Sequence, residues 1–235
     1  MGLDNELNQN NEPMLTTIEA RVLGALMEKQ LTTPDAYPIT LNSLVLACNQ
    51  KTSREPISNY ESGELQRCAS QLQDKNWIAV DYSARAARYD QRLTRILGLD
   101  KAAQALLNVM LLRGPQTLAE LLTRTQRMFE FENIKAVEEK LDYLCAKTTP
   151  YFVKILRASG QREDRYTHLL CGEPDVNAIA AMISQSKVSA AVDDERIPVL
   201  EKKIEALEQQ LENLQKKISV LMDLNGVSEE DIATN

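Results

Sequence analysis

The chain has few of the residues from which catalytic and metal sites are usually built. Its 235 residues include a single histidine, His168, and four cysteines, none of which forms a C-x-x-C pair. Acid–base catalysis and zinc binding depend on convergent histidines, cysteines or paired carboxylates. Glycine is scarce as well, and no G-x-x-x-x-G-K phosphate loop is present. We therefore expect no enzyme activity, no metal and no cofactor, and a structural or surface role for His168.

Long apolar runs are also missing. No stretch of about 18 consecutive apolar residues occurs, so no transmembrane helix is predicted. Residues 1–14 are acidic and amide-rich and lack a basic start, which is typical of a disordered arm rather than a secretory signal. Cys48, Cys68 and Cys145 lie in apolar helical stretches and read as core residues. Unpaired cysteines of this kind favour a reducing compartment, and we expect a cytoplasmic protein.

A strong positive charge is absent too. The net charge is −7, but it is unevenly distributed: residues 15–95 carry +1, residues 99–170 carry +2, and the remaining residues carry −10. The acidity therefore lies in the terminal segments. Neither middle segment is the strongly basic module expected of a protein that binds DNA without sequence preference.

The first middle segment predicts three helices and a hairpin. A hydroxyl residue followed three positions later by a carboxylate is a capping box, and apolar residues at helical spacing follow it. The predicted helices run from Thr16 to about Gln30, from Thr40 to Cys48, and from the capping box Ser58–Glu61 to near Asn76. The β-prone runs WIAVDY and RYDQRL flank a polar loop and predict a hairpin.

The second middle segment repeats this order. Helices are predicted behind Asp100, Thr117 and Asn133, and YFVKILR and RYTHLL predict a second hairpin. Two units of about 75 residues with one element order indicate an internal duplication. Three helices followed by a two-stranded wing are typical of the winged helix, a relative of the helix-turn-helix.

The C-terminal segment carries a heptad repeat. β-branched a positions with leucine at d favour a two-stranded parallel coiled coil, and the charges at e and g agree with that orientation. We therefore predict a homodimer. The alternative is that this helix packs on the body of its own chain. The predicted dimer contacts are Ile197, Leu200, Ile204, Leu207, Leu211, Leu214, Ile218 and Leu221.

The predicted fold class is thus α+β, mostly α, with two tandem winged-helix domains and a C-terminal coiled-coil helix. The boundaries are a disordered arm at 1–14, winged-helix domain 1 at 15–96, winged-helix domain 2 at 97–172, a linker at 173–196, the coiled coil at 197–224 and a tail at 225–235.

Two stretches carry a family resemblance. EARVLGALMEKQLTTPDAYPITLNSLVLACNQKTSREP at 19–56 and GQREDRYTHLL at 160–170 closely resemble the YceH-like family of uncharacterised bacterial proteins. The similarity extends from residue 15 to about residue 172. It implies tandem winged-helix domains in a bacterial cytoplasm, and it supplies no activity and no site residue.

Basic residues of the turns and wings are the candidate nucleic-acid contacts, because Arg and Lys there could neutralise phosphates. The candidates are Lys51, Arg54, Arg85, Arg88, Arg157 and Arg162. Carboxylates on both third helices oppose this hypothesis, since they would repel phosphate: Glu61 and Glu64 on the first, and Glu138, Glu139 and Asp142 on the second.

Two functions therefore remain open. The first is a DNA-associated, possibly transcriptional, regulator whose wings and turns make most of the contacts. The second is a tandem winged-helix adaptor that binds protein and gains avidity from dimerisation. The polar segment 49–56 is a candidate surface under either function, unless it is only a turn that caps neighbouring backbone. DNA and a protein partner are both possible, and no membrane association is expected.

Overall fold

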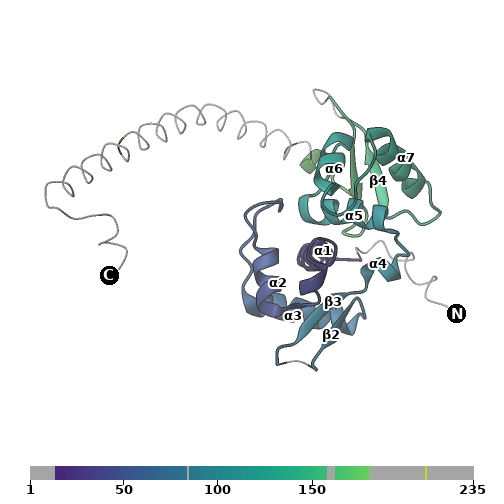
Figure 1. Ribbon diagram of the computed structural model, residues 1–235. Coiled ribbons are helices and arrows are strands. Elements are labelled where there is room, and N and C mark those ends of the chain that lie inside the picture. The colour runs from purple at the N-terminus through teal and green to yellow at the C-terminus, as the bar shows by residue number, and fades with distance from the viewer. Residues whose placement is uncertain (1–13, 84, 158–161, 180, 182–209, 211–235) are drawn as a thin grey trace. The chain divides into compact units, whose positions relative to one another are not determined.

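The computed structural model describes residues 14–83, 85–157, 162–179, 181 and 210. Residues 1–176 form one compact unit and residues 177–235 a second. All of the helices and strands named below belong to the first unit (Figure 1). The residues predicted for the coiled-coil seam lie outside the described residues.

The chain is an α+β protein in which helices predominate and the sheets are small and antiparallel. The first half (residues 15–96) contains α1 (Thr17–Thr32), η1 (Pro34–Ala36), β1 (Ile39–Thr40), α2 (Leu41–Cys48), α3 (Ser62–Asp74), β2 (Ile78–Asp81), β3 (Arg88–Gln91) and α4 (Leu93–Ile96). The second half (residues 97–172) contains α5 (Lys101–Arg113), α6 (Leu118–Thr125), α7 (Ile134–Cys145), β4 (Phe152–Ile155) and β5 (Arg165–His168). The expected order of three helices and a hairpin therefore occurs twice.

Most helix starts follow from local capping chemistry. At α1, the Thr16 backbone N–H donates to Glu19 at 2.8 Å, and the Glu19 N–H donates back to the Thr16 hydroxyl at 3.4 Å. The same reciprocal pair, Thr117 with Glu120, opens α6. Asp100 caps α5 and Asn133 caps α7, each by accepting from the backbone N–H three residues later. All of these caps were predicted from the sequence.

The predicted start of the third helix was wrong. α3 begins at Ser62 rather than after Ser58, and its N-cap is Glu61. The side chain of Asn49 binds the backbone of Tyr60 through both of its polar atoms: its Oδ1 accepts from the Tyr60 N–H at 2.8 Å and its Nδ2 donates to the Tyr60 carbonyl at 2.9 Å. These two hydrogen bonds keep Tyr60 outside the helix, so α3 does not begin at the capping sequence after Ser58.

The two sheets are related but unequal. In the first half, β3 lies between β2 and the short strand β1, which the sequence pattern did not predict. In the second half, β4 pairs with β5 alone, while Gln116 forms an isolated bridge to Tyr166 of β5. Gln116 precedes α6 and pairs with the second strand of its hairpin, just as β1 precedes α2 and pairs with β3.

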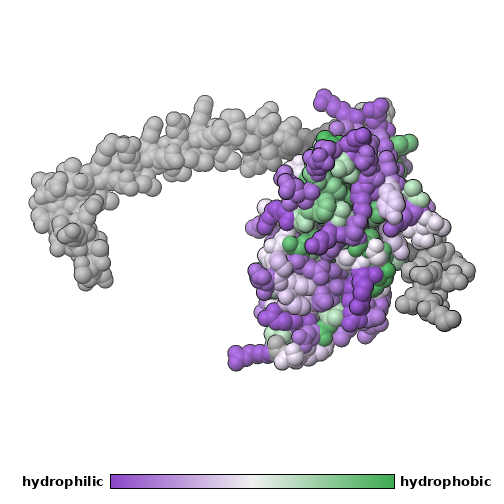
Figure 2. All heavy atoms as spheres, turned by 45° about the vertical axis from the view of Figure 1, so that its right-hand side comes forward, coloured by the Kyte–Doolittle hydropathy of each residue, from purple (hydrophilic) through white to green (hydrophobic). Residues whose placement is uncertain are grey.

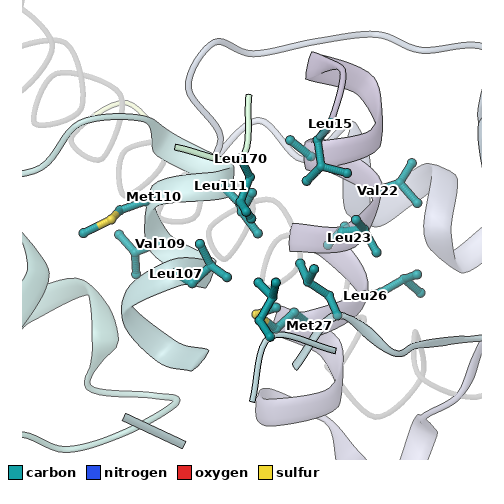
Figure 3. Close-up of a cluster of buried hydrophobic side chains, with 14 of the residues drawn as sticks. Leu15, Val22, Leu23, Leu26, Met27, Leu107, Val109, Met110, Leu111 and Leu170 are labelled. Carbon is teal, nitrogen blue, oxygen red and sulfur yellow. The ribbon is translucent and has the colours of Figure 1, made fainter. Parts of the chain in front are cut away.

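The two halves share one hydrophobic core, because α1 packs against α5 (Figure 3). Every residue of 19–27 in α1 and of 103–112 in α5 is buried. A helix that is buried on all sides covers its own half with one face and the other half with the opposite face. Burying one Leu or Met side chain contributes roughly 1.5–3 kcal/mol, so this shared core is a large part of the stability.

The contact between α1 and α5 is close at Gly24. A Cβ added at Gly24 would lie 2.9 Å from Leu112 Cδ2 and 3.1 Å from Leu111 Cβ. Asn108 of α5 donates its Nδ2 to the Gly24 carbonyl at 2.6 Å. Two backbone bonds also join the halves, from the Leu15 N–H to the Leu170 carbonyl and from the Glu55 N–H to the Leu112 carbonyl. The halves are therefore held together by polar bonds as well as by apolar burial.

Candidate nucleic-acid interface

The outer face of α3 is polar and carries an unpaired cation. Leu65, Cys68, Ala69 and Leu72 face the core, so the opposite stripe of this helix is formed by exposed residues: Gly63, Gln66, Arg67, Ser70, Gln71 and, at its C-terminal end, the carboxylate Asp74. Among the described residues, Arg67 has no recorded hydrogen-bond or ion-pair partner. Arginine, glutamine and serine are side chains that hydrogen-bond to base edges and phosphates.

The carboxylates at the start of α3 have a structural role. The Glu61 backbone N–H donates to Glu64 Oε2 at 2.8 Å, which is the N3-to-N-cap bond of a capping box. Glu64 was expected to repel DNA because no capping role was assigned to it. The later helix start changes that interpretation, because the Glu64 carboxylate turns back toward the N-terminal end of α3 and away from the outer stripe.

The turn between β2 and β3 lies beside α3. The Tyr82 hydroxyl, just after β2, contacts Gln73 Oε1 of α3 at 3.4 Å. Arg85 on this turn and Arg88, the first residue of β3, are exposed, as the hypothesis of phosphate contacts requires. The Arg88 guanidinium donates to the Pro38 carbonyl at 2.7 Å, which orients its side chain. A helix face and a basic turn thus adjoin in the first half.

Arg54 does not belong to this surface. Its side chain is fully buried and forms an ion pair of 2.5 Å with Glu28 of α1. Its Nε donates to the Ala47 carbonyl at 2.9 Å and its Nη1 to the Ser53 carbonyl at 2.8 Å. The prediction that Arg54 contacts DNA is therefore corrected, because its charge and donors are already used to fold the segment between α2 and α3.

Lys51 is exposed, but its loop extends toward the second half (Figure 1). Glu55 anchors that loop through ion pairs with Arg113 at 3.4 Å and Arg124 at 3.7 Å. The β2–β3 turn lies at the other end of the first half (Figure 1). The structure therefore does not bring Lys51 together with Arg85 and Arg88.

The second half presents a different surface. The outer stripe of α7 carries Lys135, Glu139 and Asp142, and Lys135 is paired with Glu139 at 3.6 Å. Arg157 and Arg162 of the second hairpin are exposed, and Asp164 accepts from the Arg157 N–H at 3.0 Å. This bond, with the ammonium of Lys154 at 3.2 Å, lowers the pKa of the Asp164 carboxyl. A carboxylate therefore accompanies Arg157, as Asp81 lies opposite Arg88 in the first hairpin.

Apolar side chains are exposed on the second half. Ile134 at the start of α7 is 45% exposed and Leu156 after β4 is 72% exposed. Both line a groove of about 690 Å³ together with Leu118 and Tyr166. Figure 2 shows apolar surface gathered on the upper part of the described chain. Charged side chains, among them Glu138, Lys154 and Asp164, form the rest of its lining. A groove that combines exposed apolar and charged side chains is a surface of the kind that binds protein segments.

Sequence comparison places this architecture among known proteins. The family described as "Protein of unknown function, DUF480" matches residues 15–161, which span all three helices and the hairpin of the first half and most of the second. The chain belongs to the DUF480 family. The predicted resemblance to the YceH-like uncharacterised proteins is thereby confirmed.

Relatives of the DUF480 chain are bacterial and carry the name UPF0502 protein. The relative from Cellvibrio japonicus is 65% identical over 199 residues, which cover 82% of this chain and 90% of the relative. The relative from Leptothrix cholodnii is 38% identical over 214 residues, which cover 91% of this chain and 96% of the relative. The printed names of these relatives state no activity.

Sequence reasoning missed Gln66, Arg67 and Ser70 as candidate contacts. The signal was present, because these residues lie opposite the stripe formed by Leu65, Cys68, Ala69 and Leu72, which the pattern placed in the core. The later start of α3 could not be read from the same pattern.

Proposed function

We propose that this DUF480 chain is a tandem winged-helix, DNA-associated regulator of the bacterial cytoplasm, which acts without catalysis and contacts DNA through its first half. Each half supports the winged-helix assignment through its order of three helices and a hairpin. The short strand β1 beside β3 adds the third strand common to winged-helix sheets. In this fold family the third helix commonly enters the major groove and the wing touches phosphate or the minor groove.

The observation that carries the proposal is the outer face of α3. It combines the unpaired Arg67 with Gln66 and Ser70, while Glu64 is engaged in capping. The exposed Arg85 and Arg88 adjoin this helix through the β2–β3 turn. Helix and wing can therefore act together, with base contacts from α3 and phosphate contacts from the turn.

The test is fluorescence anisotropy of the full chain with random duplex DNA over a salt series. We expect log K to fall linearly with log salt, with a slope of about −0.9 for each phosphate neutralised. The double variant Arg85→Glu/Arg88→Glu should abolish binding without unfolding the chain. Arg67→Ala should weaken binding by about 1–3 kcal/mol if it reads a base, and by less, together with a smaller salt slope, if it contacts phosphate.

Lys135→Ala is the matched control, because Lys135 occupies the outer stripe of α7 as Arg67 occupies that of α3. Its removal should leave DNA affinity unchanged. Absence of binding at low salt would refute the proposal. Equal losses for Arg67→Ala and Lys135→Ala would instead show that binding depends on overall charge and not on α3.

The second candidate function is a protein adaptor, which the exposed Ile134 and Leu156 favour. A partner segment with apolar side chains could bury them in the groove of the second half. Leu156→Asp should then release a partner that copurifies with the wild-type chain. Leu46→Asp is the matched control, because Leu46 of α2 is also 72% exposed. A partner retained by both variants would argue against this groove.

Dimerisation through residues 197–224 is part of the proposal and rests on the heptad pattern. Leu207→Pro should break the helix at a d position, because proline removes a backbone donor and clashes with the preceding turn. Sedimentation should then show a monomer in place of a dimer. A dimer that persists in Leu207→Pro would place the interface elsewhere, and a wild-type monomer would favour a helix that packs on its own chain.

A further inference from the structure

A groove of about 930 Å³ lies at the junction of the two halves. Its walls come from the end of α1, the end of β3, α4 and the first turn of α5 (Figure 1). We call it the junction groove and define it by Gln30, Gln91, Gln104, Arg92, Arg95 and Lys101. Its volume falls within the range of about 300–1,000 Å³ typical of sites for small organic molecules.

Three glutamines from three different elements meet in the junction groove. Gln30 Oε1 accepts from Gln91 Nε2 at 2.7 Å and from Gln104 Nε2 at 3.0 Å. Gln91 is further fixed by Thr94, whose hydroxyl accepts from its Nε2 at 2.9 Å and whose N–H donates to its Oε1 at 3.0 Å. Gln91 and Gln104 are each only 5% exposed. The amides are therefore held in fixed orientations.

This network leaves one donor and one acceptor without partners among the described residues. Gln30 Nε2 donates no recorded hydrogen bond, and Gln104 Oε1 accepts none. The two groups are adjacent, because Gln104 Nε2 donates to Gln30 Oε1. Neither group is among the buried polar atoms that lack a partner, so both are accessible from the groove and can hydrogen-bond to a ligand; the buried lining atom without a partner among the described residues is Asp90 Oδ1. A neighbouring donor and acceptor complement the edge of a nucleobase, and Leu31 and Leu99 add an apolar wall.

The rim of the junction groove is cationic. Arg95 and Lys101 are exposed and have no recorded partner among the described residues. Arg92 is bound to Asn76, and Asp90 provides the one carboxylate of the lining. Three cations against one carboxylate favour an anionic ligand, and arginine and lysine are the side chains that most often bind phosphate.

We propose that the junction groove binds a nucleoside monophosphate, with its phosphate at Arg95 and Lys101 and its base edge at Gln30 and Gln104. Binding at this groove does not require that the chain binds DNA. Because the groove is lined by β3 and α4 of one half and by α5 of the other, an occupant contacts both halves at once.

The test is isothermal titration calorimetry of the full chain with AMP, GMP, CMP and UMP, and with inorganic phosphate at matched ionic strength. We expect at least one of the nucleotides to bind, and inorganic phosphate to bind at least about tenfold more weakly because it lacks the base. The double variant Arg95→Ala/Lys101→Ala should weaken nucleotide binding by about tenfold or more, since each charged hydrogen bond contributes strongly.

Both substituted side chains are exposed and unpaired, so the urea midpoint of the ligand-free double variant should equal that of the wild type. Arg127→Ala/Lys135→Ala is the matched control, which removes one exposed arginine and one exposed lysine outside the groove and should retain nucleotide binding. The proposal is overturned if none of the four nucleotides binds, if phosphate binds as tightly as the nucleotides, or if both double variants bind alike.

Discussion

Gly24 and Gly63 allow one substitution to be compared in two environments. Both glycines lie within helices, Gly24 in α1 and Gly63 in the first turn of α3. A Cβ at Gly63 would meet nothing within 4 Å, whereas a Cβ at Gly24 would meet Leu112 Cδ2 at 2.9 Å and Leu112 Cγ at 3.0 Å. The difference between the two alanine variants therefore measures how closely α1 and α5 pack.

Replacing a helical glycine by alanine stabilises the helix by roughly 0.5–1 kcal/mol. Gly63→Ala should show this gain. At Gly24 the added methyl must displace the buried Leu112, and overpacking of a well-packed core costs about 1–3 kcal/mol. Gly24→Ala should therefore be neutral or destabilising by up to about 2 kcal/mol, and the two variants should differ by about 1–3 kcal/mol.

The assay is urea unfolding of both variants and the wild type, with the midpoint as the readout. The dependence of the unfolding free energy on urea should stay constant, because neither change alters the surface exposed on unfolding. If Gly24→Ala raises the midpoint as much as Gly63→Ala does, α1 and α5 have room for a methyl group, and the account of a close helix contact is wrong.

Two further predictions concern buried polar side chains. Burial lowers the pKa of His168 to about 4, and its Nδ1 has no partner among the described residues. Because the unfolded chain takes up this proton near pH 6.5, stability should fall by about 2 kcal/mol from about pH 7 to about pH 5, and His168→Leu should remove most of that slope in urea titrations. Arg54→Ala should cost about 3 kcal/mol by leaving Glu28 and two carbonyls unpaired, while Lys51→Ala, at an exposed neighbour, should change the urea midpoint little. Similar effects at both positions would contradict the burial of Arg54.

Local chemistry made much of this fold predictable. Capping residues such as Thr16, Asp100 and Asn133 act on backbone only a few residues away, so the helices that they open could be read from the sequence. The pattern failed where a distant partner decides the outcome. Asn49 delays the start of α3 across a loop, and Ile39 forms β1 only because it pairs with Tyr89 of β3.

The candidate site was predictable in part for the same reason. The exposure of Arg85 follows from its place in a polar turn between two strands, and that of Arg88 from its place at the start of β3. Arg54 looked equivalent to Lys51 in sequence, yet its burial depends on Glu28 of α1, which is 26 residues away. The packing of α1 on α5 was also missed. The sequence predicted one apolar stripe on each helix, whereas the structure buries both helices on nearly all sides, and a sequence pattern does not say which surface covers the second face.

None of the helices within the described residues is both long and apolar enough to cross a bilayer. α1 and α5 pack against each other. The hydrogen bond from Asn108 of α5 to the Gly24 carbonyl of α1 adds one polar interaction to this apolar contact.

The contact between α1 and α5 joins the corresponding first helices of two similar units. In an assembly of two identical subunits, both copies have the same sequence and therefore the same outer surface. The two units of a single chain can differ in sequence, so their outer surfaces can differ. Selection can thus act on α3 and α7 separately, and one helix presents Arg67 and glutamines where the other presents Glu139 and Asp142. A single chain that carries two such units can therefore offer two chemically different faces on one compact body.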